Sequence, residues 1–251
     1  FVAVVPKIAG FVVVLRFFEI FVAADDQFVH ATLYGIVVLT MTLGNLMALS
    51  QTDIKRMLGF SSISHAGFVM AAILIGTTQS TTGLFLYWVL FAIANIGAFA
   101  MLWLYRTKQD SIYSSDHNTL EKYAGLVKRS PMMASLMALF MLSLAGIPPF
   151  SLFWGKFYLI GAAVNTGETQ FLYLALIMAL NSAIAVYYYV KPVVFMFFKE
   201  PADYCNIEFL TNSTTALRVV VGFFALVTIS SIGIVEPLIE YISHYVQISG
   251  Y

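Results

Sequence analysis

The stretch PMMASLMALFMLSLAGIPPFSLFWGKFYLIGAA, residues 131–163, decides the fold. It is too long for one simple span, because about 20 apolar residues cross a bilayer as a helix. The run Gly146-Ile147-Pro148-Pro149 interrupts it halfway, and proline removes a backbone donor that a helix interior needs. We therefore predict two half-helices that meet at membrane depth, the first starting at Ser130-Pro131. Such a break is tolerated where the freed backbone groups face protein or water.

The rest of the chain is equally apolar. Of 251 residues, 60% are hydrophobic and only 10% are charged, whereas soluble domains have about 25% charged residues. Mean hydropathy is +0.86. We predict an all-α, polytopic transmembrane helix bundle, a single domain over residues 1–251. Its expected segments are 1–22, 31–50, 57–76, 82–105, 131–163, 171–198 and 216–247.

Smaller signals refine this outline. Pro192 and Pro237 interrupt the last two segments near an end, where we expect terminal kinks. Residues 122–126 read as a short helix at the membrane interface or as an ordered loop. The chain starts at Phe1 without an initiator Met or a signal peptide, and we expect it to be the C-terminal half of a longer protein.

The basic residues predict the orientation. The second, fourth and sixth connections hold ten of them, whereas the odd connections hold Arg16 alone. The ten are Lys55, Arg56, Arg106, Lys108, Lys122, Lys128, Arg129, Lys191, Lys199 and Arg218. By the positive-inside rule these connections are cytoplasmic, so the C-terminus lies outside. Net charge is zero, which removes any argument from bulk charge for a nucleic-acid partner.

Two lysines, Lys7 and Lys156, fall inside apolar segments. An uncompensated lysine near the bilayer centre costs about 2.5–3.5 kcal/mol on insertion scales, so it usually faces a bundle interior and marks an ion or proton path. Burial disfavours the ammonium form and a nearby carboxylate restores it, which is the requirement for a relay. The alternative is that each lysine extends to an interface or makes a fixed ion pair.

Other polar residues are less decisive. Ser61 and His65 share one helix face, and imidazole can both donate and accept a proton, although a lone histidine more often only bonds a neighbouring helix. The run 187–189, three tyrosines, suits an aromatic belt at the interface, and one hydroxyl could line a path. Helix-to-helix hydrogen bonding is the expected role of Asn45, Asn95, Asn181 and Ser182.

Motifs for cofactors are missing from the sequence. It has no GxGxxG turn, no phosphate-binding loop and no nucleophile elbow. Cys205 is the single cysteine, and the histidines are too scattered for a metal site: His30, His65, His117 and His244. We expect no metal, nucleotide, flavin or haem in this chain.

Four blocks resemble one family. Residues 44–68, GNLMALSQTDIKRMLGFSSISHAGF, form the longest block, and 5–11 precede it in the order that the family shows. LSLAGIPPF at 142–150 leads to Gly155-Lys156, and YAGL occupies 123–126. Together they resemble the antiporter-like membrane subunits of respiratory complex I, over nearly the whole chain. A lysine on the broken segment, followed by YYYVK, is most similar to the N-subunit branch of bacterial NADH-quinone oxidoreductases.

The resemblance implies a fourteen-helix subunit of a proton-translocating oxidoreductase, of which this chain would be helices eight to fourteen. Lys7 would be the central lysine, His65 the histidine between two lysines, and Lys156 the lysine of the broken helix from which the proton leaves. The family's glutamate on helix five and lysine on helix seven have no counterpart here. The chain would carry no redox centre of its own.

The resemblance also implies the surroundings. Partners would be other membrane subunits, especially neighbouring antiporter-like ones, together with lipid and protons and without nucleic acid, in the bacterial inner membrane. NADH, FMN, iron–sulfur clusters and quinone would be held by other subunits. Two alternatives remain open: a subunit of a secondary cation/proton antiporter, and a structural membrane subunit with static buried ion pairs.

Overall fold

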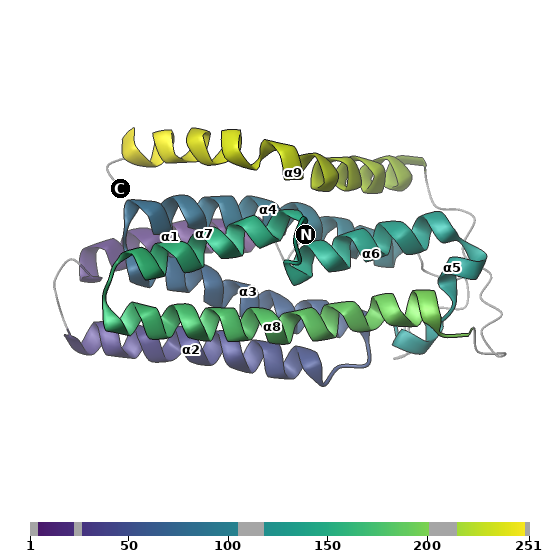
Figure 1. Ribbon diagram of the computed structural model, residues 1–251, viewed down its shortest axis with the longest axis horizontal. Helices are drawn as coiled ribbons and strands as arrows, with labels where there is room; N and C mark the ends of the chain where they lie inside the picture. The colour runs from purple at the N-terminus through teal and green to yellow at the C-terminus, as the bar shows by residue number, and fades with distance from the viewer. Residues whose placement is uncertain (1–4, 23–26, 105–117, 201–214, 249–251) are drawn as a thin grey trace.

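The computed structural model describes residues 5–22, 27–104, 118–200 and 215–248. Over these ranges the chain forms long helices that run side by side, which confirms the all-α bundle (Figure 1). The long helices are α1 (Val5–Val22), α2 (Gln27–Leu49), α3 (Ile54–Ile75), α4 (Thr78–Leu104), α6 (Pro131–Ala145), α7 (Ser151–Asn165), α8 (Thr169–Phe198) and α9 (Thr215–Ile248). Two short turns, η1 (Leu120–Tyr123) and α5 (Leu126–Arg129), precede α6.

Several helices are long and apolar enough to cross a membrane. Among the described residues these are α2, α3, α4 and α8, and α9 is a fifth when its two stretches are taken as one span. The broken span predicted at 131–163 is present as α6 and α7, each of 15 residues. Gly146 ends α6 with a φ of 75°, and the two prolines follow it. The discontinuous helix is therefore confirmed.

The other two prolines behave differently from those in the break. Pro192 lies inside α8, which continues to Phe198 as one helix, so this proline does not end the helix, and the kink expected there stays a prediction. A proline removes a single helix hydrogen bond, and α8 keeps the rest of its ladder and its packing. In α9 the stretches Thr215–Ser231 and Gly233–Ile248 meet at a bend, one turn before Pro237.

Helices α2 and α3 approach each other more closely than side chains with a Cβ would allow. A Cβ atom on Gly44 would lie 2.6 Å from the backbone nitrogen of Ser64. A Cβ on Gly67 would lie 2.9 Å from the backbone of Met41. The two glycines thus bring the backbone of α2 against that of α3, and α3 and α4 form the most buried part of the bundle.

A short segment ties one end of the bundle together. We call residues 118–129, which contain η1 and α5, the end strap. The peptide groups of Asn118 and Leu120 pair with the turn before α3 at N···O distances of 2.9 and 3.0 Å. The N–H of Gly125 donates to the carbonyl of Phe195 in the last turn of α8, at 3.1 Å. The strap therefore connects the start of α3 to the end of α8.

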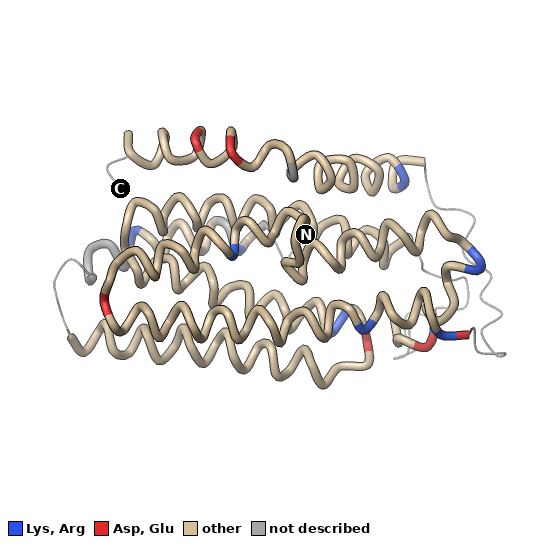
Figure 2. Tube along the Cα trace, viewed as in Figure 1, with Lys and Arg blue, Asp and Glu red and all other residues tan. Residues whose placement is uncertain are grey.

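The strap differs from the short helix expected at 122–126. Instead of one helix it contains two turns, because Gly125 adopts a φ of 64° between them. Its apolar side chains, those of Leu120, Tyr123 and Leu126, are buried. Figure 2 shows basic positions at this end of the bundle, near α5 and the start of α9, together with acidic positions near the end of α8; the opposite end has an acidic position at the α7–α8 turn and a basic one nearby.

Candidate functional site

The break between α6 and α7 holds the first predicted site residue. Lys156, on the second turn of α7, is 4% exposed. Its Nζ donates a hydrogen bond of 2.8 Å to the carbonyl of Ala145, the last residue of α6. The C-terminus of a helix carries unpaired carbonyls and a partial negative charge, so it suits a cation. The broken helix thus supplies the lysine with a partner that is neutral overall.

Gly146 makes this contact possible in two ways. Its positive φ favours glycine, and a Cβ there would lie 2.9 Å from Cδ and 3.0 Å from Nζ of Lys156. A second polar contact closes the break, where the hydroxyls of Ser143 and Ser151 are hydrogen-bonded at 2.7 Å. Both serines are buried. The two half-helices are therefore joined by one lysine–carbonyl bond and one hydroxyl–hydroxyl bond.

An aromatic ring of the neighbouring helix α3 lies beside Lys156. Its Nζ lies 5.7 Å from the ring centroid of Phe68 on α3. That ring is stacked on Tyr87 of α4, with centroids 5.7 Å apart and planes at 13°. Tyr87 also contacts α7, since a Cβ on Gly155 would lie 3.0 Å from its Cα. Tyr87 is thus held beside the residue that precedes the lysine.

His65 on α3 is the second predicted site residue. It is 2% exposed, and both of its ring nitrogens are hydrogen-bonded. Nδ1 lies 2.5 Å from the hydroxyl of Tyr87, and Nε2 lies 3.0 Å from the hydroxyl of Tyr189 on α8. Ser61, which the sequence placed on the same face, instead donates to the carbonyl of Leu58. The imidazole therefore joins hydroxyls from two other helices.

Lys7 on α1 is the third predicted site residue and is half-buried. Its Nζ donates to Oγ and to the carbonyl oxygen of Ser62, at 2.7 and 3.2 Å. Ser62 lies one turn before His65 on α3. Lys156, in turn, lies against the ring of Phe68, one turn after His65 on the same helix. The structure thus brings the three predicted residues together around α3, with His65 between the lysines.

The tyrosine run on α8 departs from the expected interfacial belt. Tyr187 is 64% exposed, but Tyr188 and Tyr189 are fully buried. The belt prediction is therefore wrong for two of the three residues, because this face of α8 packs inside the bundle. The partner residues Ser62 and Tyr87 were not predicted. Ser62 is one of three serines close to His65 and nothing in the sequence singles it out, whereas Tyr87 stands among apolar neighbours.

A separate polar cluster joins α2 to α8. The amide nitrogen of Asn45 donates to Oδ1 and to the carbonyl oxygen of Asn181, at 2.8 and 3.0 Å. The hydroxyl of Tyr188 donates to Oδ1 of Asn45 at 2.8 Å. The predicted helix-to-helix bonding of these two asparagines is thus confirmed. In contrast, the amide nitrogen of Asn95 has no hydrogen-bond partner among the described residues.

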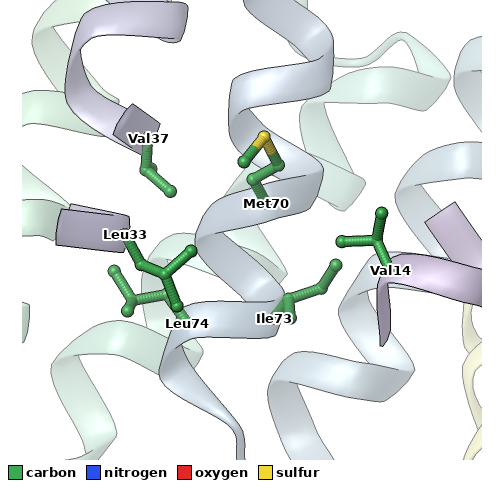
Figure 3. Close-up of a pocket in the computed structure, with 6 residues that line it drawn as sticks. All are labelled: Val14, Leu33, Val37, Met70, Ile73 and Leu74. Carbon is green, nitrogen blue, oxygen red and sulfur yellow. The ribbon is translucent and has the colours of Figure 1, made fainter. Parts of the chain in front are cut away.

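Figure 3 shows a pocket whose lining is apolar, unlike the polar site around His65. About 200 Å³ of open space lies between α1, α2 and α3. Its lining is apolar throughout: Val14, Leu33, Val37, Met70, Ile73 and Leu74. We assign it no part in proton transfer. Within the described ranges no group of three or more His, Cys, Asp or Glu side chains could hold a metal, and Cys205 and His117 lie outside those ranges.

Curated relatives match the whole chain. NADH-quinone oxidoreductase subunit N of Sulfurimonas denitrificans is 52% identical over 252 residues, which cover 100% of this chain and 50% of that protein. The subunit of the same description from Sulfurovum is 49% identical over 251 residues, again 100% of this chain and 50% of that protein. The chain thus spans about half the length of these relatives.

A solved structure and a family description agree with these relatives. A chain of respiratory complex I from Thermus thermophilus superposes with a TM-score of 0.68 at 26% identity, covering 84% of this chain and 45% of that one. A chain of the Mrp complex from Dietzia gives 0.71 at 19% identity, covering 86% and 46%, and shows the fold alone. The family described as NADH:quinone oxidoreductase/Mrp antiporter, TM, matches residues 1–185. With most of its length matched in this way, the chain belongs to the NADH:quinone oxidoreductase/Mrp antiporter membrane family.

Proposed function

We propose that this chain is part of a proton-translocating membrane subunit of a bacterial NADH-quinone oxidoreductase, in which Lys7, His65 and Lys156 transfer protons. The chemistry that drives transfer is quinone reduction elsewhere in the complex. The relatives that match the chain are described as subunit N of that enzyme, which supports the assignment.

One observation carries the proposal. Within the part of the chain that the structure describes, the hydrogen bonds of both lysines go to neutral oxygens: Lys7 to Ser62, and Lys156 to the carbonyl of Ala145. A static ion pair would instead place a carboxylate against each ammonium group. Charge removed from water and held by neutral dipoles is costly, so a lysine in this position can lose its proton when its surroundings change. This is the property that a relay needs.

The setting follows from the same proposal. The basic end of the bundle, with the end strap, faces the cytoplasm of the inner membrane, and the C-terminus lies outside. Neighbouring antiporter-like subunits and lipid surround the chain. NADH, FMN, iron–sulfur clusters and quinone belong to other subunits, and this chain supplies proton-carrying side chains only.

Replacement of the buried lysine tests the proposal. Lys156→Met keeps most of the length of the side chain and removes its proton-carrying amine. We expect at least a tenfold loss of proton pumping coupled to NADH oxidation, a conservative bound below the roughly 10²–10⁴-fold contribution of an acid–base group. The measurement uses the assembled complex in closed vesicles. Lys128→Met is the matched control, because that side chain is 60% exposed. Full pumping by Lys156→Met would refute the proposal and favour a structural subunit.

A second candidate is a subunit of a secondary cation/proton antiporter. The observation that favours it is the shared fold with a chain of the Mrp complex. Sodium/proton exchange driven by an imposed ion gradient, without any electron donor, would identify this function. Proton movement that occurs only with NADH and quinone would exclude it.

A further inference from the structure

His65 is hydrogen-bonded in a way that forces a choice between two states. A neutral imidazole has one N–H group and one bare nitrogen. Nδ1 faces the hydroxyl of Tyr87 and Nε2 faces that of Tyr189. One hydroxyl must therefore donate to the ring while the other accepts from it, and the tautomer of His65 determines which does which.

We propose that Tyr87 and Tyr189 are proton-relay residues and that His65 passes protons between their two hydroxyls. The inference rests on the proposed function and deepens it, because it names the groups on either side of the histidine. It also gives the relay a path across three helices, from α8 through α3 to α4.

The proton count balances without any electron transfer. The transfer starts from the tautomer with hydrogen on Nδ1. A proton binds the Tyr189 oxygen, the original O–H bond of Tyr189 breaks, and the released proton forms an N–H bond at Nε2 of His65. The Nδ1–H bond then breaks and an O–H bond forms at Tyr87, whose former hydrogen leaves to the next acceptor. One proton enters and one leaves, and His65 ends as the other tautomer. Rotation of the two hydroxyls and of the imidazole ring returns Tyr189, His65 and Tyr87 to their starting hydrogen-bond pattern before the next transfer.

Packing fixes both tyrosines in the geometry that this transfer requires. Both side chains are fully buried. Tyr87 is stacked on Phe68 and lies against Gly155, where the missing Cβ leaves room for it. Tyr87 therefore contacts α7, the helix that contains Lys156. Proton transfer requires donor and acceptor within hydrogen-bond distance, and the two distances at His65, 2.5 and 3.0 Å, meet that condition.

The chain offers a matched control for removal of one hydroxyl. Tyr188 precedes Tyr189, is equally buried, and bonds Asn45 rather than the histidine. The variants Tyr87→Phe, Tyr189→Phe and Tyr188→Phe each delete one hydroxyl and keep the ring. They are compared in the assembled complex by the ratio of protons pumped to NADH oxidised, and by the solvent isotope effect of pumping in heavy water.

We expect Tyr87→Phe and Tyr189→Phe to lower pumping about tenfold and to raise the solvent isotope effect, because proton transfer becomes rate-limiting. Tyr188→Phe should match the unmodified complex in both measurements. Normal pumping in the first two variants, or a loss of pumping with an unchanged isotope effect, would overturn the relay. Lys156→Met separates failure of the relay from failure of the proposed function. If the tyrosine variants pump normally and Lys156→Met does not pump, only the relay fails. If Lys156→Met also pumps normally, the proposed function fails as well.

A second substitution covers variants that do not assemble. Incorporation of 3,5-difluorotyrosine at position 189 keeps the ring and the hydroxyl but makes the hydroxyl more acidic. If Tyr189 transfers protons, the solvent isotope effect should change in this variant. If its hydroxyl only anchors His65, the solvent isotope effect should stay the same. An unchanged isotope effect in this variant would overturn the proposal.

Discussion

Substitution of Gly44 by alanine should separate α2 from α3. The added Cβ would lie 2.6 Å from the backbone nitrogen of Ser64 and 3.0 Å from its Cα. Both are backbone atoms, so no side-chain rotation relieves the contact. Non-bonded atoms prefer about 3.5–4.0 Å, so the two helices must move apart by about 1 Å. Ser64 precedes His65, and the displacement therefore reaches the site directly.

The magnitude follows from two opposing effects. Overpacking of a close contact costs about 1–3 kcal/mol in the free energy of unfolding. Replacement of a helical glycine by alanine, where there is room for the Cβ, raises the free energy of unfolding by roughly 0.5–1 kcal/mol. Gly35, on the same helix, has no atom within 4 Å of its would-be Cβ, so Gly35→Ala isolates the favourable effect. We expect Gly44→Ala to be less stable than Gly35→Ala by about 2 kcal/mol.

Heat treatment of the purified complex measures this difference. For a chain of this size, 1 kcal/mol corresponds to roughly 2–4 °C in Tm, so the two variants should differ by about 4–8 °C. The fraction of the subunit retained in the complex after each heating step is read on native gels. If Gly44→Ala is retained at the same temperature as Gly35→Ala or higher, the close approach of α2 and α3 does not exist.

Three further substitutions test other contacts by the same heat-step measurement. Asp53→Ala removes the side chain that caps α3, whose oxygen accepts from the third helical N–H at 2.8 Å, and should cost about 1 kcal/mol; Asp53→Asn should keep most of the stability, and equal losses would contradict the cap. Ser151→Ala leaves the buried hydroxyl of Ser143 without its partner and should cost about 1–3 kcal/mol. The double variant Ser143→Ala/Ser151→Ala should lose less stability than the sum of the losses in Ser143→Ala and Ser151→Ala, and strictly additive losses would refute the hydrogen bond. Asn45→Leu deprives Tyr188 of its acceptor and should lower stability by about 2 kcal/mol, while pumping in the assembled fraction stays normal; lost pumping there would place this cluster in the relay.

The features that the sequence predicted are those set by local chemistry. The run 146–149 breaks a helix wherever it stands, because proline lacks a donor and glycine permits a positive φ. Lys7 and Lys156 attracted attention because a charge inside an apolar segment is costly in any fold. Both arguments need only the residue and its immediate neighbours, and both features are present in the structure.

The partners of those residues depend on which helices are neighbours. Tyr87 stands in an apolar run, and only the packing of α4 against α3 brings its hydroxyl to His65. The tyrosine run before Lys191 suits an interfacial belt or a hydroxyl that lines a path, and only the packing of α8, which turns Tyr189 inward, decides against the belt. Hydropathy shows that a helix spans the membrane and leaves open which of its faces meets which neighbour. Contacts between helices are thus the part that sequence patterns could not supply.

The end strap has a mechanical consequence for the hydrogen bond between His65 and Tyr189. It is anchored to the start of α3 and the end of α8, the two helices that carry His65 and Tyr189. The helix rises about 1.5 Å per residue, so a slide of two residues between these helices would lengthen the 3.0 Å hydrogen bond to about 4 Å and break it. A tie at one end restricts that sliding without touching the reacting groups. The strap therefore limits changes in the distance between His65 and Tyr189, on which the proposed relay depends.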